Sequence, residues 1–136
     1  MAGWKDFREI AAWQFAQQVK LRVYAFVEQP KVQRNFAFRN QLAEAARSAP
    51  ANIAEGFGRF GNKEFARFAR IAKASEIEVL NHLIDARDQR LLTDDQLAIE
   101  EHHVRRALKA IVGLIHHLES TPEPLSPPRK DRTRNS

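Results

Sequence analysis

The chain has few of the residues that carry covalent or redox chemistry. It contains no cysteine, one methionine and five glycines among 136 residues. Without cysteine it has no disulfide, no thiol nucleophile and no thiolate metal ligand, which fits a reducing cytoplasm. No apolar stretch approaches the roughly 18 residues of a membrane span, and the charged start, MAGWKDFREIAAW, does not resemble a secretory signal peptide. We therefore expect a cytoplasmic protein with no membrane association.

Histidine and acidic residues are present, but their spacing does not predict a metal site or an active site. No His-x-x-x-His occurs, and Glu100-x-x-His103 lacks the second Glu-x-x-His that a di-iron bundle needs. Glu78 and His82 are four residues apart and are expected to hydrogen-bond on a helix surface. No motif pairs a nucleophile with a base, and no Arg-to-His spacing fits a helical ribonuclease. We expect no metal, no cofactor and no enzymatic activity.

Basic residues outnumber acidic ones, and the excess is uneven along the chain. There are 22 Lys and Arg against 17 Asp and Glu, a formal net charge of +5. Residues 31–61 carry five basic and two acidic residues, and residues 121–136 carry four and two, whereas residues 93–120 carry three and five. This distribution admits nucleic acid as a partner.

Four segments repeat apolar residues with the 3.6-residue period of a helix, and none alternates like a strand. The first spans residues 6–28, before Pro30, and the second spans residues 36–55. The third begins at Asn62 as its N-cap, and the fourth opens with the capping box TDDQ at residues 93–96. The predicted core residues are Ala12, Ala16, Val19, Val23, Phe26 and Val27; Phe38, Leu42, Ala45, Ala46, Ala49 and Ile53; Phe65, Phe68, Ala69, Ala72, Val79 and Leu83; and Leu97, Val104, Leu108, Ile111, Ile115 and Leu118.

Short connections between these segments predict an all-α fold, an antiparallel up-down-up-down four-helix bundle over residues 1–119. Residues 120–136 contain four prolines and no apolar period, which predicts a disordered, Pro-rich basic tail. Glu76 falls in the apolar sector of the third helix, where a buried acid needs a hydrogen-bond donor.

The first helix has large apolar side chains outside its core face. These residues are Ile10, Trp13, Leu21 and Tyr24. They either shield the edge of the bundle or form an interface between copies of the chain.

The stretch SAPANIAEGFGRFGN, residues 48–62, joins the second and third helices. Its glycines follow a helix rather than a strand, and no Gly-Lys-Ser/Thr is present, so a phosphate-binding loop is not indicated. Gly56 is expected to end the second helix in the left-handed conformation, and Gly58 and Gly61 to allow the reversal into Asn62. Pro50 is expected to bend the helix. Four side chains recur at helical spacing, which predicts a polar network with an ion pair in the corner: Ser48, Asn52, Glu55 and Arg59.

The run from Ser48 to Arg59 resembles the signature of the four-helix-bundle family encoded in bacterial 23S rRNA intervening sequences, to which diversity-generating-retroelement accessory proteins are similar. The matching positions are Ser48, Pro50, Asn52 to Gly56, Gly58 and Arg59. The resemblance implies a bundle that assembles into a ring, often a pentamer, and that associates with structured RNA or with a reverse transcriptase. The chain departs from the family pattern at Ala43-Glu44, where a basic pair is usual, and at Ala74 and Glu76.

A basic stripe is the remaining candidate for function. Lys63, Arg67 and Arg70 recur four and three residues apart on the outer side of the third helix, with Lys73 at its edge. Five further residues are expected to add to this surface: Arg39, Arg47, Arg105, Arg106 and Lys109. An ordinary solvated helix face is the alternative.

We therefore expect a non-enzymatic, self-associating bundle that binds structured nucleic acid, RNA in particular, through cations. The alternative is a protein-interaction scaffold or accessory subunit, for example for a reverse transcriptase, with Trp13 and Tyr24 in the recognition surface.

Overall fold

The fold is helical over the residues that the structure describes. The computed structural model describes residues 3–122, and no strand occurs in that range. The four long helices are α1 (Ala11–Val27), α3 (Phe36–Phe57), α4 (Asn62–Asp88) and α5 (Asp94–Ser120). A 3-10 helix, η1 (Phe7–Glu9), precedes α1, and a short α2 (Pro30–Gln33) separates α1 from α3. The predicted all-α fold with four long helices is confirmed.

The boundary between bundle and tail was expected after residue 119, and α5 continues through Ser120. The predicted disordered tail lies outside the described residues from position 123 onward.

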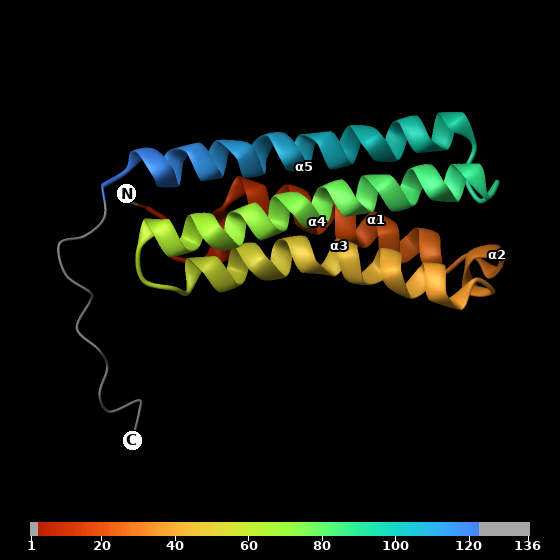
Figure 1. Ribbon diagram of the computed structural model, residues 1–136, viewed down its shortest axis with the longest axis horizontal. Helices are drawn as coiled ribbons and strands as arrows, with labels where there is room; N and C mark the ends of the chain where they lie inside the picture. The colour runs from red at the N-terminus through yellow and green to blue at the C-terminus, as the bar shows by residue number, and fades with distance from the viewer. Residues whose placement is uncertain (1–2, 123–136) are drawn as a thin grey trace, which may run out of the picture.

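The four long helices lie side by side along the long axis of the molecule (Figure 1). Both α1 and α4 pack against α3 and against α5, so the four helices enclose one interior. The α3–α4 connection lies at one end of the bundle, whereas α2 and the α4–α5 connection lie at the other (Figure 1). Within residues 3–122 no helix is both long enough and apolar enough to cross a bilayer.

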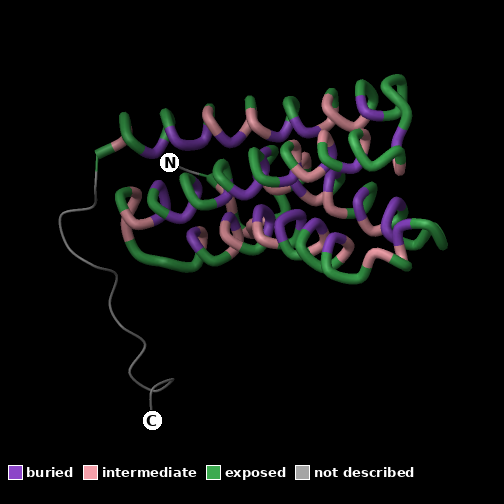
Figure 2. Tube along the Cα trace, turned by 45° about the vertical axis from the view of Figure 1, so that its right-hand side comes forward, coloured by how far each residue is buried: buried purple, intermediate pink, exposed green. Residues whose placement is uncertain are grey.

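The predicted core faces are the faces that the bundle buries, and Figure 2 shows these buried stripes along the long helices. Every predicted core residue of α1, α3 and α4 is buried. Of the core residues predicted on α5, all are buried except Leu108, which is half-buried, and Ala107 and Leu114 are buried as well. Burying each large aliphatic side chain contributes roughly 1.5–3 kcal/mol, so these stripes supply most of the driving force for packing.

The helix ends were predicted less well than the core. The capping box of α5 is present, with Thr93 Oγ1 accepting from the Gln96 N–H at 3.0 Å and Gln96 Oε1 accepting from the Thr93 N–H at 2.9 Å. The first predicted helix is interrupted at Ile10, whose backbone is extended between η1 and α1. Asn62 was expected to cap α4, but the N-cap is Gly61 at φ 90°, a conformation that favours glycine.

Gly56 was expected to end α3 in the left-handed conformation, and this expectation is wrong. The residue is buried inside α3, and the helix runs on to Phe57. A Cβ at Gly56 would lie 2.7 Å from Phe65 Cδ1 and 2.8 Å from Phe68 Cβ. The glycine is therefore needed for the close approach of α3 and α4 rather than for a turn.

Glu76 lies in the core of the bundle without a partner. Its side chain is fully buried, and neither carboxyl oxygen has a hydrogen-bond partner among the described residues. On α4 it stands between Ala72, in the apolar cluster near the α3–α4 corner, and Val79, in the cluster near α2. Burial raises the pKa of this carboxyl from 4.5 to about 8. The group is therefore held neutral at neutral pH, because the core contributes no counter-charge.

Replacing Gly56 by alanine should destabilise the protein. The added Cβ overlaps two buried phenylalanine side chains, and overpacking of this kind costs about 1–3 kcal/mol. Urea unfolding should therefore show a lower midpoint for Gly56→Ala. The matched control is Gly113→Ala on α5, where a Cβ meets nothing within 4 Å, so the free energy of unfolding should rise by up to about 1 kcal/mol. Equal effects of the two substitutions would contradict the close-approach argument.

Replacing Glu76 by glutamine should flatten the pH dependence of stability. Unfolded Glu76 ionises above pH 4.5, whereas the folded group keeps its proton to about pH 8. The unfolded state thus binds fewer protons in this window, and the free energy of unfolding falls as pH rises, by about 3 kcal/mol between pH 4.5 and 7. Urea unfolding at several pH values should show this decline in the wild type and a smaller one in Glu76→Gln. Glu78→Gln, on the exposed side of α4, is the control; an unchanged slope in Glu76→Gln contradicts the prediction.

Candidate nucleic-acid interface

The α3–α4 corner carries a cluster of arginines on an aromatic ring. Arg59, in the connection, lies with its guanidinium 5.0 Å from the centroid of the Phe68 ring, and Arg67 lies 4.6 Å from the same centroid. Phe68 is held in place because it is buried against Gly56. One core aromatic therefore positions two guanidinium groups, one from the connection and one from α4.

Each of these arginines also forms an ion pair. Arg59 Nη2 lies 2.8 Å from Glu55 Oε2, and Arg67 Nη2 lies 3.0 Å from Glu64 Oε2. The hydrogen bond from Arg67 lowers the pKa of the Glu64 carboxyl. All four side chains remain about half exposed, so the pairs contribute little to stability and their guanidinium groups remain accessible to other anions.

Arg70 and Lys63 extend the cluster towards the end of α5. Arg70 Nη1 lies 2.6 Å from Glu119 Oε2 and so bridges α4 to the last turn of α5. Lys63 and Arg70 both line an open hollow of about 360 Å³ beside Thr121. The predicted stripe of Lys63, Arg67 and Arg70 is thus exposed on one surface, and Lys73 is exposed further along α4.

The other five predicted basic residues are dispersed. Arg39 is half-buried between α1 and α3, near the opposite end of the bundle, with its guanidinium 5.0 Å from the Phe36 ring. Arg47 is 3.9 Å from Glu44, and Arg105 is 2.7 Å from Glu101. Arg106 lies 4.4 Å from the ring of Phe15 on α1, and Lys109 is exposed on α5. None of the five lines the hollows that Lys63, Arg67 and Arg70 line. Arg39 lies near the opposite end of the bundle and does not extend the stripe, and for the other four residues the expectation stays a prediction.

The predicted polar network is present in a different form. Asn52 Nδ2 donates to Ser48 O at 2.8 Å and to Ser48 Oγ at 3.0 Å, and Ser75 on α4 donates to Ser48 Oγ at 2.8 Å. Glu55 and Arg59 pair outside this network, on the surface. Pro50 is buried inside α3, which continues past it. These side chains therefore fix the packing of α3 on α4, and they do not form a solvent-filled cleft.

The candidate interface residues of the first helix divide into two groups. Ile10 is 1% exposed in the core, so its assignment to an interface is wrong. Trp13 packs against the core, with its ring 5.3 Å from that of Phe7. Leu21 is 53% exposed, and Tyr24 is half-buried beside a hollow between α1 and α3. Of these four residues, Leu21 is the most exposed, Trp13 and Tyr24 are half-buried, and Ile10 is buried.

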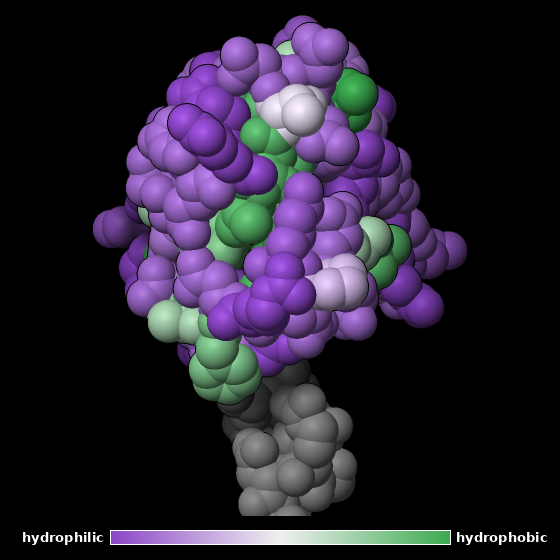
Figure 3. Space-filling view, turned by 90° about the vertical axis from the view of Figure 1, so that its right-hand side faces the viewer, coloured by the Kyte–Doolittle hydropathy of each residue, from purple (hydrophilic) through white to green (hydrophobic). Residues whose placement is uncertain are grey.

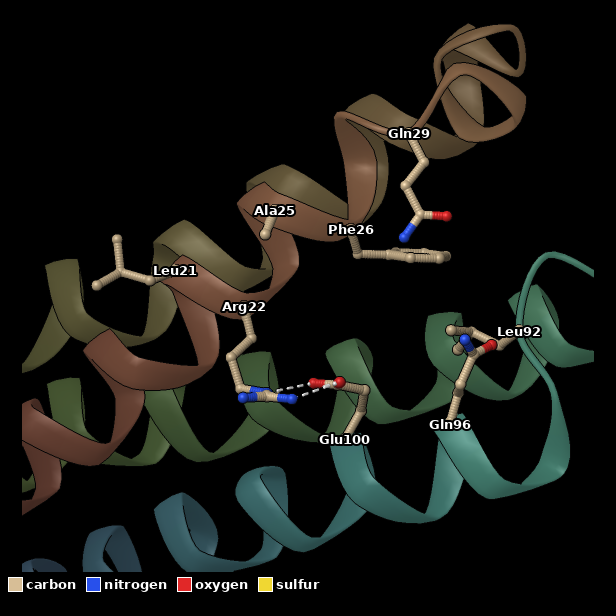
Figure 4. A pocket seen from close by; sticks show the side chains of 8 residues that line it. All are labelled: Leu21, Arg22, Ala25, Phe26, Gln29, Leu92, Gln96 and Glu100. Atoms are coloured by element: carbon tan, nitrogen blue, oxygen red, sulfur yellow. Dashed lines mark hydrogen bonds and ion pairs between the residues drawn. The ribbon is translucent and has the colours of Figure 1, made fainter.

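Leu21 borders an open hollow of about 400 Å³ between α1 and the start of α5. Figure 3 looks onto this end of the bundle and shows apolar surface at the bottom of a hollow with polar flanks. In Figure 4 Arg22 and Glu100 point towards one another from α1 and α5, 2.8 Å apart, and Phe26 and Leu92 lie closer to α2. The Arg22–Glu100 ion pair crosses the hollow, and Leu21 lies at the edge of the hollow.

The acidic and histidine side chains do not gather into a metal site. In the part of the chain that the structure describes, no group of three or more His, Asp and Glu residues is placed to hold a metal ion. The predicted contact between His82 Nε2 and Glu78 Oε2 is present at 3.4 Å.

Sequence reasoning assigned Arg59 to the structural motif and did not include it in the basic surface. Arg59 precedes Lys63 by four residues and Arg67 by eight, a spacing that would place the three on one helix face. The chain turns between Arg59 and Lys63, so this spacing alone did not indicate that they share a surface. Phe60 in the same connection was not considered, although it is 41% exposed.

Comparison with known proteins agrees with the signature in residues 48–59. The family model described as 23S rRNA-intervening sequence protein matches residues 8–113, most of the four helices. A search of curated proteins gives no match. The chain therefore belongs to the 23S rRNA-intervening sequence protein family.

Proposed function

We propose that this protein is a non-enzymatic, self-associating antiparallel up-down-up-down bundle that binds structured RNA electrostatically through the α3–α4 corner. The observation that carries the proposal is the convergence of Arg59, Lys63, Arg67 and Arg70 on one exposed surface. Lys73 adds a fifth cation, and among residues 3–122 the arginines of the corner pair with the carboxylates of Glu55, Glu64 and Glu119. The sequence after α5 carries four further basic residues, at positions 129, 130, 132 and 134, outside the described residues.

The ion pairs of the corner are compatible with RNA binding. Exposed pairs are worth about 0–1 kcal/mol each, so an RNA phosphate can replace a carboxylate at little cost. Binding would release counterions from the RNA, which makes the affinity fall as salt rises. The three carboxylates each face an arginine, which disfavours their action as general acids or bases and supports a role without catalysis.

Self-association would multiply this modest charge. A ring of copies repeats the corner several times around one particle, so the potential that attracts a polyanion rises with the number of copies. The exposed Leu21 and the half-buried Tyr24 are the side chains that we assign to the contact between copies. The family membership supports a link to RNA because its name refers to 23S rRNA.

A protein-interaction scaffold, such as an accessory subunit of a polymerase, is the second candidate. The apolar hollow beside Leu21 favours it, because such a hollow fits an apolar side chain of a partner. Light scattering and the ratio of absorbance at 260 and 280 nm after purification at low salt distinguish the two candidates. A particle larger than one chain that carries nucleic acid supports RNA binding, and a monomer contradicts the self-association.

Replacing Lys63, Arg67 and Arg70 together by alanine should weaken binding of a synthetic RNA stem-loop. Each lost phosphate contact reduces the slope of log affinity against log salt by about one, so the triple variant should have a visibly shallower slope in filter binding at about 50–200 mM salt. The control triple variant, Arg105→Ala with Arg106→Ala and Lys109→Ala, removes the same charge from α5 and should lose less. Equal losses in the two variants, or wild-type affinity that is independent of salt, contradict the proposal.

A further inference from the structure

An exposed aromatic side chain stands beside the basic cluster. Phe60 is 41% exposed, whereas Phe65 and Phe68, on the first turns of α4, are buried. Phe57 packs against the core with its ring 6.4 Å from that of Phe65. No ring or guanidinium among residues 3–122 stacks on Phe60. The corner thus uses three of its four phenylalanines for packing and leaves one ring facing solvent.

Phe60 and the cations border the same space. An open hollow of about 310 Å³ is lined by Phe60, Lys63, Glu64, Arg67 and Arg70. Its volume is at the small end of the range for ligand pockets, about 300–1,000 Å³, which suits one planar group rather than a folded element. An aromatic surface flanked by Lys and Arg is the arrangement by which proteins hold an unpaired nucleotide, with the base on the ring and the phosphates on the cations.

We propose that this hollow binds one unpaired base of an RNA, stacked on Phe60, with the flanking phosphates on Lys63, Arg67 and Arg70. The inference rests on the proposed function and names its substrate class, RNA that offers unpaired nucleotides in loops, bulges or single strands. A base inside an A-form duplex is stacked on its neighbours and does not reach the ring. The protein therefore binds a loop or single strand more tightly than a duplex of equal charge.

A salt series distinguishes the contribution of stacking to RNA affinity from the contribution of charge. Contacts between cations and phosphates weaken as salt rises, whereas stacking on a ring is largely independent of salt. Because every base has an aromatic face, the site tolerates any base. Loss of the ring should therefore reduce affinity for unpaired RNA by a factor that stays constant through a salt series.

The matched control lies at the opposite end of the bundle. Phe36 is 64% exposed and also stands beside an arginine, Arg39, at 5.0 Å. Neither Phe36 nor Phe60 belongs to the buried core, so alanine at either position should leave the fold intact. Phe60→Trp keeps an aromatic face and provides a rescue variant.

The test measures binding of two probes to the full chain and its variants: a single-stranded oligoribonucleotide and a blunt RNA duplex. Phe60→Ala should lower affinity for the single strand about tenfold or more, at every salt concentration, and leave the duplex unchanged. Phe60→Trp should retain binding, and Phe36→Ala should bind both probes as the wild type does. Thermal unfolding by circular dichroism checks that each variant is folded.

Each other outcome has a defined meaning. Unchanged single-strand binding in Phe60→Ala, or equal losses on both probes, overturns the stacking inference; if the wild type still binds with strong salt dependence, the proposed function stands. Absence of RNA binding by the wild type overturns both. A 2-aminopurine base in the single strand gives an independent readout, because its fluorescence depends on its stacking partners: binding should change the fluorescence with the wild type, and Phe60→Ala should lose that change.

Discussion

The close approach of α3 and α4 at Gly56 is the contact on which the arginine cluster of the α3–α4 corner depends. Because residue 56 has no side chain, Phe65 and Phe68 pack directly against the α3 backbone. Phe68 then receives the guanidinium groups of Arg59, from the connection, and Arg67, from α4. A larger residue at position 56 would displace the ring that positions these two groups. In the proposed function, Gly56 would therefore act through packing rather than through contact with a ligand.

The corner has the properties of a site that exchanges anions. Its arginines are oriented by an aromatic ring and by carboxylates, so little side-chain entropy is lost when a phosphate binds. The carboxylates also limit the net charge of the corner, so under the proposed function a single copy would bind nucleic acid weakly. Strong binding then requires either several copies or an additional contact that is not electrostatic. Self-association through Leu21 and Tyr24 would provide the first, and the Phe60 ring would provide the second.

Much of the fold was predictable, because it follows from the periodicity of apolar residues. Much of the site was unpredictable, because it follows from how the helices pack. The buried stripes and the Thr93 capping box were read from spacing alone. Spacing also placed Ile10 among the interface residues, because a helical wheel cannot show that η1 interrupts the helix. Gly56 was assigned to a helix end because glycine is common there. In this fold a glycine is needed at position 56 because α4 approaches the α3 backbone too closely for a side chain. The dispersal of Arg39, Arg105 and Arg106 depends on which helices are neighbours, which composition does not specify.

The central claim is that RNA contacts the α3–α4 corner, and ultraviolet crosslinking of the full chain to an RNA stem-loop, followed by peptide mapping, tests it most directly. Crosslinked nucleotides should fall on the peptide that spans residues 59–70, with Phe60 as the principal adduct. Crosslinks confined to the α1 surface around Tyr24, or to the middle of α5, would contradict the claim.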